Sequence, residues 1–267
     1  MTEFLYGLDS RAVAAALALT LLCALDVGYR FGRPRAATSS EALRSHIGVV
    51  EGSLLGLLAL VLGFTFAVAL QHFDARYQAV VTEANALGTT WLRSALLPEP
   101  ARGELRALVL QYVDARIAES HVTLAADDAR KAALVRTDEL VEALWAATAR
   151  ALAADDRVTT TGFFVQTLND AIDAYGARNA ALDHHVPEVV LWILFATFAV
   201  SAGVLGYGAG LAAHRPPLAS VLLVLLMVVV SYLIVDLDRP RRGLVQVSQQ
   251  PMLNLRASMA PNAPIAP

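Results

Sequence analysis

Four long apolar runs with almost no charge constrain what this chain can fold into. They cover residues 12–29, 52–71, 189–213 and 216–235. A bilayer core of roughly 30 Å needs about 20 residues of helix, so each run is long enough to cross a membrane once. Only a short turn with His214, Arg215 and two prolines separates the third and fourth runs, which therefore form a membrane hairpin.

Composition agrees with a membrane protein and excludes several other classes. The 267 residues are 56% hydrophobic and 17% charged, with a mean hydropathy of +0.51. The net charge is −3 and Lys131 is the single lysine, so no basic patch indicates nucleic-acid binding. Cys23 is the single cysteine, which excludes internal disulfides and cysteine-based zinc or redox sites.

The chain between the second and third runs is charged and alanine-rich, with apolar residues at helical spacing. Pro98 and Pro100 end a first helix there, and apolar stripes at 105–113, 140–152 and 164–175 predict three more. We therefore predict an all-α membrane protein with four transmembrane helices and a helical soluble domain inserted between the second and third. The predicted segments are 1–71 with the first two transmembrane helices, 72–188 as the soluble domain, 189–236 as the transmembrane hairpin, and 237–267 as a juxtamembrane segment and flexible proline-rich tail.

The second transmembrane helix is predicted to continue into the soluble domain, because no proline interrupts it before Pro98. Residues four apart share a helix face, and two such rows occur. The first row is Gly56, Leu60 and Phe64. The second row runs from Tyr77 through Val81 to Asn85, Thr89 and Arg93, and we call Tyr77, Asn85, Thr89 and Arg93 the polar row. Repeated around a symmetry axis, these rows would form an apolar pore neck and a wider vestibule. The same spacing also fits ordinary packing faces.

Charged residues beside the apolar runs are further candidates. Glu51 and Glu83 would each form a negative ring if they faced a pore, and Glu51 could instead cap a helix N-terminus. A dense juxtamembrane cluster follows the fourth run and consists of Asp236, Asp238, Arg239, Arg241 and Arg242. Our main interpretation of this cluster is anchoring to lipid headgroups, with internal pairing or clasping of the soluble domain as alternatives.

Enzyme and metal functions find little support. His184 and His185 follow Asp183, but adjacent helix residues point about 100° apart and no third ligand has suitable spacing. The glycines between Gly206 and Gly210 lie in a membrane helix, where small residues allow close helix packing. We predict no catalytic residue, no metal site and no cofactor.

Two short stretches resemble a known family. The pore helix of bestrophins is similar to Val61-Leu62-Gly63-Phe64 and His72-Phe73-Asp74-Ala75-Arg76-Tyr77. The bacterial bestrophin-like family of membrane proteins is more similar still, with features at Arg76, Glu83-Ala84-Asn85, Gly88-Thr89, Leu92-Arg93, Leu97-Pro98, Asn169, Asp173 and the segment from Asp236 to Gly243. This second resemblance covers nearly the whole chain.

The resemblance implies a pentameric ion channel whose apolar neck lies on the second transmembrane helix, at Gly56, Leu60 and Phe64. Bestrophins have bulky apolar residues where Gly56 stands, and no acidic cluster here matches a calcium clasp, so calcium gating is not implied. The resemblance also implies a bacterial inner-membrane protein with its soluble domain and both termini in the cytoplasm. The arginines alone leave this orientation open, because they are divided between segments on opposite sides of the membrane.

We therefore expect a homo-oligomeric ion channel in the lipid bilayer, conducting inorganic ions and favouring anions. Arg93 supports the anion preference, because it shares a row with uncharged polar residues, whereas Glu83 lies about 200° from that row. The alternative is a non-conducting membrane module that senses or binds a partner through its helical domain.

Overall fold

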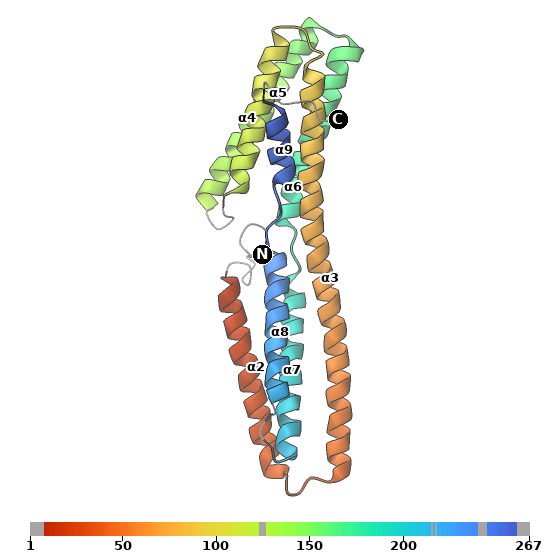
Figure 1. Cartoon of the computed structure of the whole chain (residues 1–267), viewed down its shortest axis with the longest axis vertical. Helices are drawn as coiled ribbons and strands as arrows, with labels where there is room; N and C mark the ends of the chain where they lie inside the picture. Colours follow the sequence, from red (N-terminus) through yellow and green to blue (C-terminus); the bar gives the residue numbers. More distant parts are fainter. Residues whose placement is uncertain (1–7, 123–126, 215, 217, 240–244, 261–267) are drawn as a thin grey trace. The chain divides into compact units, whose positions relative to one another are not determined.

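The computed structural model describes residues 8–122, 127–214, 216, 218–239 and 245–260 (Figure 1). It has two compact units, described separately below. The membrane unit comprises Met1–Gln71 and His185–Arg239, and the bundle unit comprises His72–His184 and Pro240–Pro267. No strand occurs among the described residues, so the predicted all-α class is confirmed.

The helices of the membrane unit are α2 (Ser10–Gly32), the 3₁₀ turn η1 (Arg33–Arg35), the first part of α3 (Glu41–Ser94), α7 (Glu188–Leu211) and α8 (Leu218–Leu237). Within the described residues, four helical segments are long and apolar enough to cross a membrane, and they contain α2, α3, α7 and α8. The four predicted crossings are therefore confirmed. The second helix also runs without interruption to Ser94, as the absence of proline predicted.

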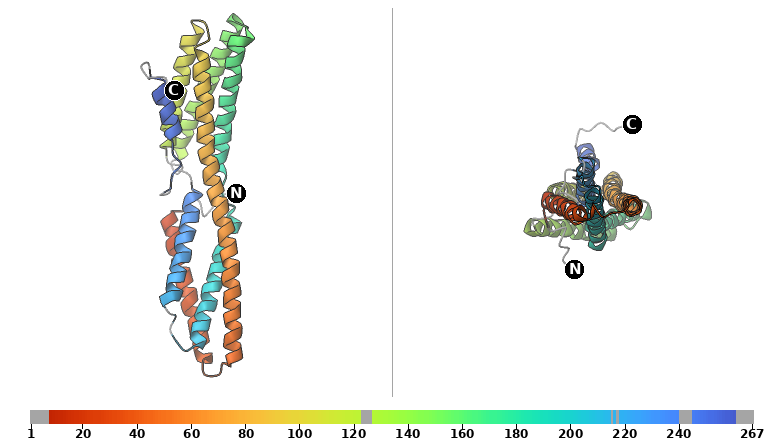
Figure 2. Two further views of the ribbon diagram at one scale, coloured as in Figure 1. Left: turned by 45° about the vertical axis from the view of Figure 1, so that its right-hand side comes forward. Right: turned by 90° about the horizontal axis from the view of Figure 1, so that it is seen from below.

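Glycines bring α2 and α7 into backbone contact. A Cβ built on Gly28 would lie 2.0 Å from the carbonyl oxygen of Gly203, and one built on Gly206 would lie 2.0 Å from that of Leu25. Two further views show α2 beside α7 and α8 (Figure 2). Lipid tails are as apolar as leucine, so close packing of small residues has to hold such helices together. Gly206 thus serves the helix packing that the sequence predicted.

The bundle unit contains the rest of α3, then α4 (Ala101–Ser120), α5 (Asp127–Ala154), the π-helical turn η2 (Val158–Gly162), α6 (Phe163–Asp183) and α9 (Gln250–Ser258). The three predicted stripes face its core, which is formed by side chains of α3, α4, α5, α6 and α9. The exception is Leu152 at the end of the second stripe, which is 41% exposed, while the neighbouring Ala151 is buried. Fully buried examples are Val109 of α4, Leu144 of α5 and Phe164 of α6. Helical spacing therefore located the parts of this core that α4, α5 and α6 supply.

The C-terminal segment differs from its prediction. We expected a flexible tail after the fourth crossing, and this is wrong for Gln250–Ser258, which forms α9. Proline in the first turn of a helix is tolerated, because its missing N–H would have no partner there, so Pro251 lies at the start of α9 and does not break it. Met252 and Met259 are buried in the core of the bundle unit, which gives this short helix its stability.

The backbone contact of α2 with α7 predicts that alanine at Gly206 destabilises the membrane unit. The new methyl group would meet the backbone of α2, which cannot yield as a flexible side chain would. We expect the free energy of unfolding to fall by about 1–3 kcal/mol, the usual cost of overpacking. Thermal unfolding of the purified protein in detergent measures this loss.

Gly203→Ala is the matched control on the same helix. A Cβ at Gly203 would meet only the carbonyl oxygen of Ala24, at an ordinary contact distance of 3.8 Å. We expect this variant to unfold like the parent. Equal losses for the two variants would contradict glycine-mediated packing at Gly206.

Candidate functional site

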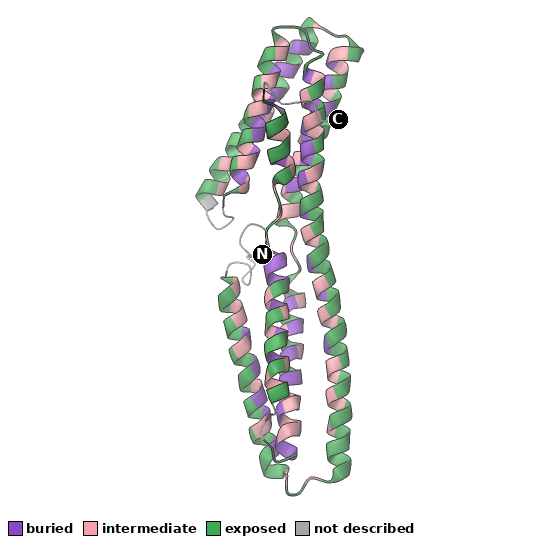
Figure 3. Cartoon of the chain, in the orientation of Figure 1, coloured by how far each residue is buried: buried purple, intermediate pink, exposed green. Residues whose placement is uncertain are grey.

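The part of α3 in the membrane unit has one face that no described residue of this unit covers. Leu60 and Phe64 are 55% and 65% exposed, and a Cβ built on Gly56 would meet no atom within 4 Å. The opposite face carries the buried residues Leu58 and Thr65. Figure 3 shows the exposed and partly exposed residues along this length of α3. The predicted neck residues therefore share an open apolar face, but whether this face lines a pore stays a prediction.

The polar row in the bundle unit is also open. Asn85 and Thr89 are exposed and Tyr77 is 37% exposed. Arg93 is half-buried: its Nη1 donates to the carbonyl oxygen of Phe163 over 2.9 Å, and its guanidinium lies 5.4 Å from the centre of the Phe163 ring. Among the described residues no carboxylate pairs with Arg93. In the described part of the chain its charge is therefore held in place without a carboxylate that would neutralise it.

Glu51 faces away from the predicted neck. It lies five residues before Gly56, which places it about 140° around the helix, and its carboxylate lies against Gly208 of α7. The helix-capping alternative is wrong, because α3 begins at Glu41 and not at Glu51. A ring of Glu51 carboxylates at the neck would require the side chain to lie on the same helix face as Gly56. Glu51 lies on a different face.

Glu83 is fully buried in the bundle unit, where two arginines bind it. Its Oε1 accepts a hydrogen bond from Arg116 Nε over 2.7 Å, and its Oε2 accepts one from Arg178 Nη1 over 2.6 Å. A third pair joins Arg116 to Glu119 one turn along α4. The two acids and two arginines balance within the protein, so Glu83 does not have the environment that a charged ring at a pore would need.

Two tyrosines extend this network. Tyr112 donates to Glu83 over 3.1 Å, and burial first, then the Glu83 charge, raises the pKa of Tyr112 well above its ordinary value. Tyr175 donates to Asp138 over 2.8 Å, its ring lies 4.7 Å from the Arg116 guanidinium, and burial raises its pKa to about 12. Both tyrosines are therefore neutral donors at physiological pH.

Opposed effects set the pKa of Glu83. Burial by itself raises it, but the charges and hydrogen bonds of Arg116 and Arg178 outweigh burial and hold it below its ordinary value of 4.5. The carboxylate is therefore charged at neutral pH. A buried charge of this kind is tolerated only because its partners surround it.

Three residues of the juxtamembrane cluster are described, and they lie in the membrane unit. Asp236, Asp238 and Arg239 are all buried, with at most 4% exposure. Asp238 accepts a hydrogen bond from the backbone N–H of Val186 over 2.7 Å, and Arg239 donates to the carbonyl oxygen of Leu8 and to Ser10. Headgroup anchoring is therefore the wrong interpretation for these three buried residues, of which Asp238 and Arg239 join the ends of α2, α7 and α8. Arg241 and Arg242 lie outside the described residues.

The two histidines have separate surroundings. His185 Nδ1 lies 2.9 Å from the carbonyl oxygen of Asp238 in the membrane unit. His184 belongs to the bundle unit, where its ring lies 5.3 Å from that of His72. The His184 carbonyl accepts a 2.6 Å hydrogen bond from buried Arg76, which also binds the Ala181 carbonyl over 3.1 Å. Arg76 thus satisfies carbonyls at the end of α6, a role that sequence reasoning did not assign.

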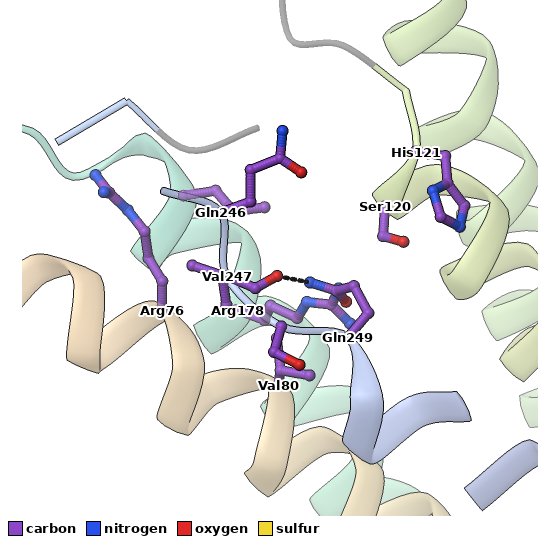
Figure 4. Close-up of a pocket in the computed structure, with 10 residues that line it drawn as sticks. Arg76, Val80, Ser120, His121, Arg178, Gln246, Val247 and Gln249 are labelled. Carbon is purple, nitrogen blue, oxygen red and sulfur yellow. Dashed lines mark hydrogen bonds between the residues drawn. The ribbon is translucent and has the colours of Figure 1, made fainter. Parts of the chain in front are cut away.

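A cavity of about 270 Å³ lies in the bundle unit (Figure 4). Its walls come from α3, the end of α4, α6 and the segment before α9, and its described lining residues are Arg76, Val80, Ser120, His121, Arg178, Leu182, Gln246, Val247, Ser248 and Gln249. Sequence reasoning missed this site. No spacing signal links its four segments, and residues 246–249 were assigned to a flexible tail.

Loss of the Glu83 charge is predicted to destabilise the bundle unit strongly. Glu83→Gln keeps the side-chain volume but leaves two buried arginines without their shared carboxylate. Removing one partner of a buried ion pair costs about 3–5 kcal/mol. Hydrogen exchange of α3, α4 and α6 in the purified protein measures the change.

The exposed Glu142→Gln is the control and should change little. The pH dependence gives a second check. Since folding lowers the pKa of Glu83, its stabilisation is present above pH 4.5 and is lost as the pH falls below that value. The difference between the parent and Glu83→Gln should therefore shrink under acid conditions. A difference that stays constant down to the lowest pH would contradict this assignment.

Comparison with known proteins assigns the family. A family model for the Bestrophin-like domain matches residues 12–252, which is well over half of the chain. No curated protein and no solved structure matches the chain. The match includes all four apolar segments, the bundle unit up to Met252, and the charged clusters described above. This chain is therefore a membrane protein of the bestrophin-like family.

Proposed function

We propose that this protein is a homo-oligomeric ion channel in which α3 of each copy lines a central axis. The observation that carries the proposal is the open apolar face of α3 in the membrane unit, with Gly56, Leu60 and Phe64 on it. An apolar constriction built from repeated side chains gates ions by expelling water. Glycine at one position lets neighbouring helices approach closely. The family relationship supports ion handling, and a pentamer is the oligomer that the bestrophin resemblance favours.

We infer a preference for anions from the charges along α3. Five copies of Arg93 would give a positive ring, and the nearby Asn85 and Thr89 side chains would replace part of an anion's water shell. The two acids that could oppose this ring both have other surroundings. Glu51 lies against α7, and Glu83 is neutralised inside the bundle unit. The proposed activity is transport, with no chemical reaction catalysed.

A non-conducting module remains the competing function. The cavity beside Arg178 in the bundle unit favours it, because a sensing domain needs a place for a ligand. Flux measurements on protein reconstituted in liposomes separate the two functions. A module would pass no ions in any salt, and its α3 helices would not meet around a common axis.

The neck is tested by Leu60→Ala combined with Phe64→Ala. Smaller side chains widen and wet the constriction, so we expect ion flux from liposomes to rise severalfold over the parent. Leu222→Ala with Leu226→Ala is the matched control, since these two residues are also exposed, apolar and four apart, but on α8. Unchanged flux in the first variant, or an equal rise in the second, would rule out the neck.

Selectivity is tested by the reversal potential in a salt gradient. We expect the parent to favour anions and Arg93→Ala to move the reversal potential toward zero, because the positive ring is lost. Arg136→Ala removes an exposed arginine of α5 that pairs with Glu139, and it should leave the potential unchanged. A cation-selective parent would refute the assignment, as would an anion preference that Arg93→Ala does not reduce.

We further propose a bacterial inner-membrane location with the bundle unit in the cytoplasm. A Cys23→Ser background that carries Asp128→Cys places one thiol on the exposed start of α5. An impermeant maleimide should label this thiol in permeabilised cells but not in intact spheroplasts. Labelling of intact spheroplasts would place the bundle unit on the opposite side.

A further inference from the structure

The cavity of the bundle unit is rich in hydrogen-bond donors and lacks acids. Its described lining residues include two arginines, two glutamines, two serines and a histidine, but no aspartate or glutamate. Its volume of about 270 Å³ is close to the lower end of the range for small-molecule pockets. A site with this composition favours a small ligand that carries negative charge.

Arg178 supplies the clearest contact for such a ligand. The side chain is 2% exposed and lines the cavity. Its Nη1 donates to Glu83 and its Nη2 donates to Gln249 over 2.7 Å, but its Nε–H has no partner among the described residues. Guanidinium groups bind carboxylates side-on through Nε and one terminal nitrogen. Arg178 is thus oriented by two hydrogen bonds, and neither of them uses its Nε–H.

The other walls set the shape of the ligand. Figure 4 shows Arg178 beside Gln249 and Val247, with Ser120 and His121 across the cavity. The Gln249 amide is fixed on both sides, since its Oε1 accepts from Arg178 and its Nε2 donates to the Val247 carbonyl over 3.1 Å. Val80, Leu182 and Val247 add apolar surface. This combination suits a short carbon chain that ends in a carboxylate.

We propose that this cavity binds a small organic acid, with its carboxylate on the Nε–H of Arg178 and its carbon chain against Val80, Leu182 and Val247. This site is separate from the proposed pore, since its lining residues all belong to the bundle unit and do not include the polar row of α3. A ligand bound in this cavity would contact the segment before α9 together with α3 and α6. The proposal does not require that the protein conducts ions.

The test compares butanoate with butanamide, which has nearly the same shape but no charge. Isothermal titration calorimetry on the full-length protein in detergent should show butanoate binding at least about tenfold more tightly than butanamide, as a charge-assisted hydrogen bond predicts. Equal affinities for the two, or no binding of butanoate, would overturn the proposal.

Two variants locate the binding site. Arg178→Lys keeps a positive charge for Glu83 but lacks the Nε donor, so butanoate affinity should fall about tenfold. Ser248→Phe places a large ring at an exposed wall position of the cavity and should abolish butanoate binding, and this variant still decides the question if Arg178→Lys fails to fold. Arg130→Lys alters an arginine outside the cavity, paired with Asp183, and should bind like the parent. Full affinity in Ser248→Phe would place butanoate elsewhere, for example in a pore, and overturn the proposal.

Discussion

The bundle unit depends on one buried carboxylate. Glu83 of α3 binds Arg116, 33 positions away on α4, and Arg178, 95 positions away on α6, and Arg178 in turn holds Gln249 just before α9. Four segments that are distant in sequence thus share one network of charges. Apolar side chains of similar volume would fill the same space, but they would not require a particular partner at each position. We suggest that this network fixes the order in which the helices pack, while the surrounding leucines and valines supply most of the stability.

Backbone contacts and hydrogen bonds to backbone groups hold the membrane unit together. Among lipid tails, apolar surface gives helices no reason to associate, so α2 and α7 rely on glycine contacts between their backbones. The polar cluster at Asp238 and Arg239 then joins the ends of α2, α7 and α8 through hydrogen bonds to backbone groups. The α3 face with Leu60 and Phe64 takes part in neither contact. This difference between tightly joined and uncovered helices is the physical basis for proposing assembly around α3.

Three charged residues of α3 in the bundle unit serve separate tasks. Arg76 holds carbonyls at the end of α6, and Glu83 organises the bundle core, so neither is available to a pore. Arg93 differs, because it lies on the open polar row with Asn85 and Thr89, and no carboxylate of the described residues pairs with it. On α3, Glu83 thus serves the fold, while Arg93 is the charge on which the proposed anion preference rests.

The sequence alone determined the four membrane crossings, the helical insert, the uninterrupted α3 and the bestrophin-like family, because length, hydropathy and helical spacing are local properties of the chain. The tertiary structure decided which charges pair. Three acids near apolar runs looked alike in the sequence. In the structure Glu51 lies against a glycine, Glu83 is enclosed by arginines, and Asp238 accepts a hydrogen bond from a backbone N–H. It also decided that Gln250–Ser258 is helical, since Met252 and Met259 find a core there that no local pattern reveals. Pairing and burial depend on residues far away in the sequence, so a local pattern cannot specify them.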